Sequence, residues 1–340
     1  MPAPTNPPNI LVVRFSSIGD ILLITPLLRA LRERHPAARI TVLTKRAYTP
    51  LLSDNPRLNE VINLEAGGSL VRLAGQLRAA SHTHRLDLHG NLRTYALRAL
   101  VPGRWTGYPK HRIARALLIH HKRNYYRAWR PVPERYFRAA RGLDVTADGG
   151  PPEFFLGSAA EQKAADWLAT TGLPSKRPLI AIAPGAAHAT KRWPQEHWQM
   201  LLSRILADRF SVILVGGPDD AELGATLARS APPGVANATG IFGLQETGAL
   251  LRRAAAVVSG DTGVMHMATG VGTPVVALFG PTVKSFGFFP YTARATVLEL
   301  DLPCRPCSKQ GSSRCPLGHH RCLIDLKPDR VYDALRLRIA

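Results

Sequence analysis

The chain has 340 residues, 45% of them apolar, so it is long enough for two domains and can bury a sizeable core. It carries 44 Lys and Arg residues against 24 Asp and Glu residues, a net charge of +20. This charge predicts a polyanionic partner, such as nucleic acid, an anionic membrane surface or a phosphorylated substrate. No apolar run approaches the ~20 residues that cross a bilayer, which excludes a membrane-spanning helix.

Residues 1–8 are rich in proline and lack the basic and apolar regions of a signal peptide. They are expected to form a disordered lead-in. The protein is therefore expected to be cytoplasmic, with peripheral association at a membrane's inner face as a further option.

The first half of the chain alternates strands and helices. A buried strand is predicted over residues 9–15, followed by a polar loop that ends at Asp20 and an amphipathic helix to about His35. Pro26 is expected to tighten or kink the first turns of that helix. Further strands, with helical patterns between them, are predicted over residues 39–44, 61–64 and 85–88. This alternation is typical of a doubly wound parallel sheet, in which Asp20 follows the carboxyl end of a strand, where such sheets bind ligands.

Residues 104–141 carry eleven Lys and Arg side chains but one acid, Glu134, with aromatic residues interleaved. This composition is typical of nucleic-acid surfaces and equally of surfaces that bind anionic lipid head groups. The alternative is a solvated basic face whose aromatic residues belong to the core. We favour a functional patch, because so large an excess of bases over acids is hard to reach by drift.

A turn-rich break over residues 146–152 is the best linker candidate. A second α/β series follows it, with predicted strands over 179–183, 211–215 and 254–258 and predicted helices over 158–171, 194–208 and from about 219 and 246. Two Rossmann-like domains that face each other across a cleft are therefore expected, over residues 9–150 and 151–326, with a C-terminal helix in 327–340.

Three loops at successive strand ends of the second half carry groups that hold phosphates and sugars. Residues 184–194 supply hydroxyl, ammonium and guanidinium groups, and residues 216–222 supply carboxylates for ribose hydroxyls. Residues 259–268 form a glycine-containing turn that starts a helix, where unpaired N–H groups suit an anion. Each loop alone could be an ordinary turn or capped helix start. None matches a P-loop or a full G-x-G-x-x-G, so a nucleotide-diphosphate site of another kind is predicted.

Four cysteines, Cys304, Cys307, Cys315 and Cys322, lie close together with the spacing C-x2-C-x7-C-x6-C. Reducing cytoplasm disfavours disulfides, so the pattern indicates either a structural zinc site or ordinary thiols. His319 and His320 are substitute ligands in the first case. A zinc with four protein ligands would have no open position for chemistry.

Four stretches of the sequence together carry a family resemblance. They are Arg14-Phe15-Ser16-Ser17-Ile18-Gly19-Asp20 with the following Thr25-Pro26, Lys191 to Trp198, Asp261 to His266, and Gly318 to Asp325. They are similar to the bacterial ADP-heptose:lipopolysaccharide heptosyltransferases, glycosyltransferase family 9, which have the GT-B fold. The similarity covers about residues 9–338, and the ending from Leu323 resembles the heptosyltransferase II branch.

The resemblance implies an inverting, metal-independent transfer of heptose from ADP-heptose to the inner core of lipopolysaccharide, with no cofactor. The N-terminal domain would bind the anionic, lipid-linked saccharide acceptor at the inner-membrane surface, and the C-terminal domain would bind the nucleotide sugar. Asp20 matches the family's general base, although a plain helix cap is the simpler role for it. Lys191 matches the phosphate-binding lysine that stabilises the departing diphosphate, against the simpler role of a solvent-facing lysine.

The same resemblance extends to residues that contact the two substrates. Those expected to bind the nucleotide sugar are Gly185, Thr190, Lys191, Asp220, Glu222, Asp261, Thr262, Gly263 and His266. Asp220 and Glu222 are alternatives for the ribose carboxylate, and His266 could instead be a packed helix histidine. Those expected to bind the acceptor are Ser16, Ser17, Gly19, His89, Asn91, Arg93, Lys122 and Arg123.

Two other functions remain open at the level of sequence. One is a GT-B transferase that uses another nucleotide sugar or acceptor, because sequence does not reveal sugar stereochemistry. The other is a basic nucleic-acid-binding protein with a zinc-ribbon-like tail. No nucleic-acid partner is expected if the family resemblance is correct.

Overall fold

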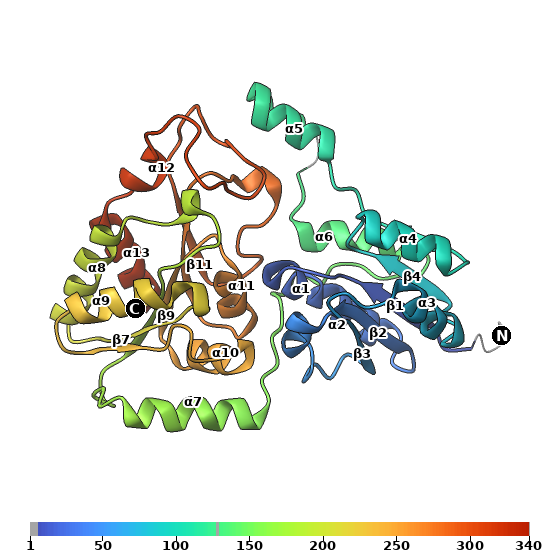
Figure 1. Cartoon of the computed structure of the whole chain (residues 1–340), viewed down its shortest axis with the longest axis horizontal. Coiled ribbons are helices and arrows are strands. Elements are labelled where there is room, and N and C mark those ends of the chain that lie inside the picture. The colour runs from blue at the N-terminus through green and yellow to red at the C-terminus, as the bar shows by residue number, and fades with distance from the viewer. Residues whose placement is uncertain (1–5, 127–128, 340) are drawn as a thin grey trace. The chain divides into compact units, whose positions relative to one another are not determined.

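The computed structural model describes residues 6–126 and 129–339. Residues 1–5 of the expected lead-in, and Arg127 of the basic tract, lie outside the described residues. Contacts divide the chain into two compact units (Figure 1): unit 1 comprises residues up to 110 together with 132–155, and unit 2 comprises 111–131 together with 156–340. The division differs from a single boundary near residue 150, because the chain leaves unit 1 after Lys110 and returns to it at Val132.

Unit 1 contains a five-stranded sheet in the order β3-β2-β1-β4-β5, with every neighbouring pair parallel. Its strands are β1 (Asn9–Val13), β2 (Arg39–Lys45), β3 (Glu60–Leu64), β4 (His84–Asp87) and β5 (Trp105–Gly107). Its helices are α1 (Ile18–Leu22), α2 (Thr25–Arg34), α3 (Leu70–Ala79), α4 (Leu92–Leu100) and α6 (Val132–Tyr136), with 3-10 turns η1 (Arg46–Leu51) and η2 (Phe137–Ala140). The four strands predicted for this half are confirmed to within one or two residues.

Unit 2 contains a six-stranded parallel sheet in the order β11-β10-β9-β6-β7-β8. Its strands are β6 (Leu179–Ala183), β7 (Ser211–Leu214), β8 (Val235–Asn237), β9 (Ala256–Gly260), β10 (Val275–Phe279) and β11 (Ala295–Glu299). Its helices are α5 (Arg112–His121), α7 (Ser158–Thr170), α8 (Gln195–Ala207), α9 (Ala221–Ser230), α10 (Leu244–Arg253), α11 (Gly263–Gly270), α12 (Arg321–Ile324) and α13 (Pro328–Ile339). Short 3-10 turns are η3 (Ala189–Lys191), η4 (Pro218–Asp220) and η5 (Lys284–Phe286).

Both faces of each sheet are covered, which explains the continuous apolar runs in the sequence. In unit 2, one core lies between the strands and α8, α9 and α13, and Trp198 and Leu335 are buried in it. The alternate residues of the same strands, such as Ala181 and Val257, are also buried. The prediction of two doubly wound α/β units is confirmed. No helix in the described ranges is both long and apolar enough to span a bilayer.

The single helix predicted after Asp20 is divided in two at the expected place. α1 ends at Leu22 and α2 starts at Thr25, so Pro26 falls in the first turn of α2, where a missing N–H leaves no hydrogen bond unmade. The Thr25 hydroxyl donates to the carbonyl oxygen of Leu22 at 2.7 Å, which joins the two pieces.

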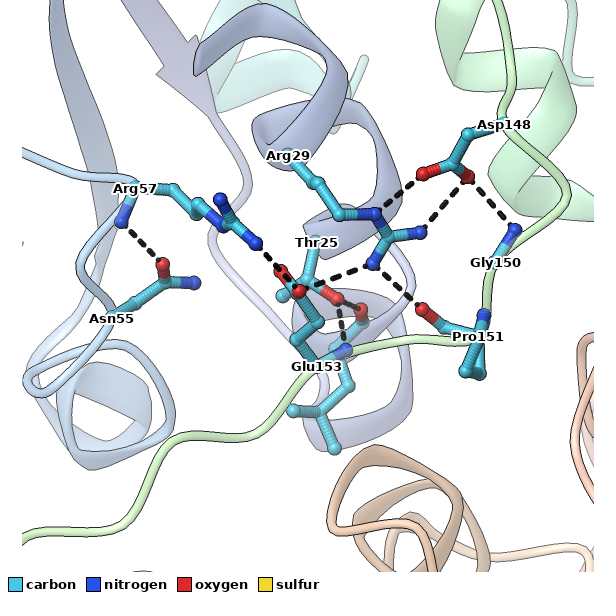
Figure 2. Close-up of polar contacts among 9 residues, drawn as sticks. Thr25, Arg29, Asn55, Arg57, Asp148, Gly150, Pro151 and Glu153 are labelled. Carbon is cyan, nitrogen blue, oxygen red and sulfur yellow. Dashed lines mark hydrogen bonds and ion pairs between the residues drawn. The ribbon is translucent and has the colours of Figure 1, made fainter. Parts of the chain in front are cut away.

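The turn-rich segment around residues 148–153 is fixed to unit 1 by polar contacts with α2 (Figure 2). The buried guanidinium of Arg29 forms two hydrogen bonds with Asp148 and donates to the carbonyl oxygen of Pro151 at 3.0 Å. Glu153 pairs with Arg29 and with Arg57, and its backbone N–H donates to the Thr25 hydroxyl at 2.8 Å. The predicted linker is therefore a docked part of unit 1 as far as Glu153.

Arg29→Met is expected to lower the free energy of unfolding by about 3 kcal/mol, because two carboxylates lose a buried guanidinium partner. Arg34→Met is the matched control: the Arg34 and Asp144 side chains are 57% and 81% exposed. Its loss is expected to cost less than about 1 kcal/mol. Urea unfolding followed by circular dichroism measures both, and equal losses would contradict an anchoring role for Arg29.

Candidate active site

The strand orders place the predicted site residues at two topological switch points. In unit 1 the switch lies between β1 and β4, and in unit 2 it lies between β6 and β9. Open α/β sheets bind ligands beyond the carboxyl ends of such strand pairs. Asp20 lies in α1, which follows the loop after β1, and the loops after β6 and β9 carry Lys191 and Asp261. Each unit thus gathers its own candidate residues at one edge of its sheet.

Asp20 lies in the first turn of α1, where its carboxylate has three partners from the preceding loop. One carboxylate oxygen forms an ion pair with the Arg14 guanidinium. The other accepts hydrogen bonds from the Ser17 backbone N–H at 3.2 Å and from the Ser17 hydroxyl at 3.1 Å. Arg14 is itself held by the carbonyl oxygens of Ser16 and Leu88. Asp20 therefore closes the capping box of α1 and is also fixed in position as a buried anion.

The charge state of Asp20 is set by opposing effects. Burial by itself raises the pKa of Asp20, but the Arg14 guanidinium and the Ser17 hydrogen bonds outweigh burial and hold the pKa below its usual value. The carboxylate is therefore ionised at neutral pH. An ionised carboxylate can accept a proton, which is the first requirement of a general base.

The residues after β4 have different local roles. His89 lies beside Phe15, with 5.0 Å between ring centroids. Burial, with the Arg14 and Lys110 charges, lowers the pKa of His89 to about 4, so its ring is neutral at pH 7. Asn91 caps α4 by accepting from the Thr94 N–H at 3.0 Å. Arg93, also expected to contact the acceptor, is exposed on the first turn of α4.

Sequence reasoning assigned no role to Arg14, Tyr108 or Tyr136, all of which surround Asp20. The two tyrosine rings meet edge to face at 4.7 Å, and the Arg14 guanidinium lies 6.0 Å from the Tyr136 ring centroid. Burial raises the pKa of both tyrosines, so both are neutral phenols. Of the three, only Arg14 could have been recognised from the sequence, because an arginine at the end of an apolar strand is seldom buried without an acidic partner.

Lys191 is held at the unit 2 switch point by Asp261. The two side chains are 13% and 9% exposed, and the ammonium lies 2.6 Å from Asp261 Oδ2. The ammonium also donates to the Asp261 carbonyl oxygen at 3.0 Å. An ammonium has three N–H donors, so one is left for a ligand. The lysine is therefore partly buried and fixed in direction.

The start of α11 adds backbone donors next to this lysine. Thr262 precedes the helix in an extended conformation, and its side chain does not cap it. Its hydroxyl instead meets the Ser259 hydroxyl at 3.1 Å. The first N–H groups, from Gly263 on, therefore remain available to an anion. His266 lies one turn later and is buried, with 4% of its surface exposed.

Asp220 and Glu222, the two alternatives for the ribose carboxylate, occupy different environments. The Asp220 carboxylate lies against Gly185 and Gly216, where a Cβ atom on either glycine would come within 2.6 Å of it. Burial raises the pKa of Asp220, and the Gly217 N–H at 3.0 Å offsets part of that effect. Glu222 is exposed in the first turn of α9. Of the two, Asp220 is the one packed beside the loop after β6.

Thr190 forms hydrogen bonds with the segment that carries the four cysteines. It is buried, its backbone N–H donates to the Ser312 carbonyl oxygen at 3.1 Å, and its hydroxyl accepts from the Ser312 N–H at 2.8 Å. A ring nitrogen of His320 lies 3.0 Å from the Thr190 carbonyl oxygen. The Thr190 hydroxyl therefore stabilises the conformation of the loop that carries Lys191.

Lys122 and Arg123, expected to bind the acceptor, lie in residues 111–131, which belong to unit 2. The Lys122 ammonium donates to the Pro306 carbonyl oxygen at 2.6 Å, while Arg123 is exposed. The same stretch is fixed by the Trp129 indole N–H, which donates to the Lys284 carbonyl oxygen at 2.9 Å. These two residues thus belong to a different unit from Asp20.

The cysteines do not form a metal site in the described ranges. All four are free thiols, and no group of three or more His, Cys, Asp or Glu side chains there is arranged to hold a metal ion. Burial raises the pKa of Cys322 to about 11 and also raises that of Cys307, in each case with added repulsion from other cysteines. Zinc displaces such protons when it binds thiolates, so the raised pKa values do not decide the question, and structural zinc stays a prediction.

Comparison with known proteins gives consistent matches. Residues 70–317 match glycosyltransferase family 9 (heptosyltransferase). Lipopolysaccharide heptosyltransferase 2 of Escherichia coli is 29% identical, with 96% of this chain and 97% of that protein covered. A glycosyl transferase family 9 structure from Veillonella parvula superposes with a TM-score of 0.82 at 24% identity, covering 98% of each chain. The E. coli ADP-heptose lps heptosyltransferase II structure gives 0.75 at 27% identity, covering 97% of this chain and 98% of that one.

Proposed function

Since the chain belongs to glycosyltransferase family 9, we propose that it transfers heptose from ADP-heptose to the inner core of lipopolysaccharide. The chain is a glycosyltransferase, and its two parallel sheets are those of a GT-B enzyme. The donor and acceptor are inferred from the heptosyltransferase relatives, and the mechanism is inferred from the two switch-point sites.

The donor binds in unit 2 in this proposal. The pyrophosphate of ADP-heptose accepts hydrogen bonds from the first N–H groups of α11 and from the remaining N–H of the Lys191 ammonium. Asp220, beside Gly185, accepts hydrogen bonds from the ribose hydroxyls. Gly185 and Gly216 let this carboxylate reach the loop after β6, because any larger residue would displace it. The developing negative charge of departing ADP is stabilised without a metal ion.

The acceptor reacts in unit 1 in this proposal. Asp20 takes the proton from an acceptor hydroxyl as that oxygen attacks the anomeric carbon of the heptose. The bond from that carbon to the ADP oxygen breaks with inversion of configuration, and ADP carries away the bonding electrons. Ser16 and Ser17 form the loop before α1, Gly19 precedes Asp20 in that helix, and Arg14 keeps Asp20 charged.

The observation that carries the proposal is the Lys191–Asp261 pair at the switch point, next to an uncapped helix start. The test is transfer itself: the protein is incubated with ADP-heptose and heptose-deficient inner-core acceptor, and products are identified by mass spectrometry. Other nucleotide sugars are run in parallel. Transfer from one of them in place of ADP-heptose would support the alternative of a GT-B enzyme with another donor.

ADP binding separates this enzyme from a nucleic-acid-binding protein. At a hundredfold excess over its Kd, ADP should stabilise the folded state by about 2.7 kcal/mol. Duplex DNA should not, and any DNA binding should fall steeply with added salt. Stabilisation by DNA and none by ADP would make the protein a basic nucleic-acid-binding protein instead.

We further propose that residues 111–131 bind the anionic acceptor and lipid head groups at the cytoplasmic surface of the inner membrane. This stretch contains six Lys and Arg residues and no Asp or Glu. The side chains of Ile113, Tyr125 and Trp129 are 78%, 50% and 40% exposed, so apolar groups accompany the charges. Apolar and cationic groups together are what an anionic bilayer surface binds.

The double variant Arg112→Gln/Arg123→Gln is expected to weaken partitioning onto phosphatidylglycerol vesicles about 10- to 30-fold, since each charge contributes about 1 kcal/mol. Vesicle co-sedimentation at low salt measures it. The control Arg72→Gln/Arg229→Gln removes the same net charge from exposed sites elsewhere. Equal weakening by both pairs would mean that total charge, rather than this stretch, attracts the membrane.

No cofactor enters the proposed chemistry. A structural zinc on the four cysteines, the alternative that their spacing raised, would be detected as one equivalent of bound metal in protein purified without chelator. Absence of metal in that analysis would identify the cysteines as plain thiols.

A further inference from the structure

The stretch from Glu299 to Cys322 contacts both parts of the chain that hold Lys191. On one side, Ser312 and His320 bind Thr190, the residue before the lysine, through the contacts described above. On the other side, Arg305 contacts the loop after β10, and Thr282 in that loop contacts Asp261, the carboxylate partner of Lys191. One segment of sequence therefore touches the lysine's own loop and the surroundings of Asp261.

The Arg305 side chain holds the loop after β10 by donating hydrogen bonds to backbone carbonyl oxygens of that loop. Its side chain is 5% exposed, and its guanidinium donates to the carbonyl oxygens of Gly280, Leu300 and Thr282, the last at 2.7 Å. Glu299 balances its charge at 2.6 Å. The Cys307 N–H adds a hydrogen bond to the Pro281 carbonyl oxygen at 3.2 Å. Residues 280–282 are thus fixed by several donors from the 299–322 segment.

Thr282 connects this fixed loop to the lysine. Its buried hydroxyl donates to Asp261 Oδ2 at 2.7 Å, the same oxygen that pairs with the Lys191 ammonium. The hydroxyl thus occupies part of the acceptor capacity of that oxygen and sets the rotation of the carboxylate. Both effects determine how firmly Asp261 holds the ammonium and which way the remaining N–H points.

We propose that the 299–322 segment is a clamp that positions Lys191 for the donor pyrophosphate, with Thr282 as the positioning residue that orients Asp261. The inference rests on the proposed function, in which Lys191 binds the pyrophosphate of ADP-heptose. It also gives the cysteine-rich segment a role that requires no metal ion.

The test is ADP affinity of the full chain by titration calorimetry. Thr282→Val keeps the shape and removes the hydroxyl, and it is expected to raise the Kd for ADP about three- to tenfold, the effect of losing one ordinary hydrogen bond, because the hydroxyl acts on ADP only through Asp261 and Lys191. Thr282→Ser retains the hydroxyl and should restore wild-type affinity. KM for the nucleotide sugar should follow the same pattern.

Thr273→Val is the matched control, because its hydroxyl is also buried and donates to a backbone oxygen, that of Leu251, at 2.9 Å. It should lower thermal stability and leave the Kd for ADP unchanged. If Thr282→Val does the same, Thr282 is merely structural and the inference fails. If Thr282→Val does not fold, Arg305→Lys takes its place and should also weaken ADP binding. Wild-type protein that does not bind ADP would instead overturn the proposed function.

Discussion

Asp20→Asn is expected to bind ADP as tightly as the wild type and to transfer heptose about 10²–10⁴-fold more slowly, the range for loss of a general base. The amide keeps the shape of the side chain but cannot accept a proton. Steady-state kinetics and calorimetry measure the two effects separately. Asp148→Asn is the matched control, since it changes an arginine-paired carboxylate elsewhere in unit 1. Near-normal turnover by Asp20→Asn would remove it as the base.

The pH dependence offers a second check on the same residue. Because the Asp20 pKa is lowered, kcat/KM should stay level as pH falls from neutrality and should decline only below the usual titration range of an aspartate. Arg14→Met removes the main lowering influence, so that burial, which raises the pKa, is opposed only by the Ser17 hydrogen bonds. The acid limb of the profile is then expected to move to higher pH. A limb that stays in place in Arg14→Met would mean that another group limits the rate.

Lys191→Met is expected to reduce kcat/KM for ADP-heptose about 10²–10³-fold, because the departing pyrophosphate loses a fixed positive charge in a partly buried site. The Kd for ADP should rise as well, by about 10-fold or more, since a charge-assisted hydrogen bond is lost. Calorimetry and initial rates measure these quantities.

A matched lysine in the same unit provides the control for this variant. Lys163 forms an ion pair with Glu246 and is 61% exposed, so Lys163→Met should leave both constants unchanged. Thermal unfolding checks that Lys191→Met remains folded with Asp261 deprived of its partner. Unchanged ADP affinity in folded Lys191→Met would show that the pyrophosphate binds elsewhere.

Much of the fold could be predicted from local patterns, because the central strands are continuous apolar runs separated by turn signals. The short strands β5 and β8 could not, since three residues carry no periodicity. The position of Asp20 after β1 followed from the strand–loop–helix pattern. Its partnership with Arg14 did not, because it depends on β4 lying beside β1 and supplying the Leu88 oxygen.

The contacts that define the donor site are long-range, and local sequence patterns do not reveal them. The hydrogen bonds between Thr190 and Ser312 join residues 122 positions apart. Similarly, the spacing of the cysteines predicts a metal site, which stays a prediction, but it does not reveal that Arg305 and Ser312 in the same segment contact distant loops. The basic tract was evident from composition, but nothing in its pattern indicated that residues 111–131 associate with the later unit.

That association has a consequence for the order in which the protein can assemble during synthesis. Lys122 contacts Pro306, 184 residues further along the chain. Residues 111–131 can therefore make this contact only after most of the polypeptide has been translated. Unit 1 meanwhile cannot be completed until residues 132–155 have left the ribosome. A cationic, aromatic stretch is therefore exposed on the nascent chain while the N-terminal part is already folding. The two units therefore cannot be made as separate chains divided at residue 150. Such a division would remove residues 151–155 from unit 1 and residues 111–131 from unit 2.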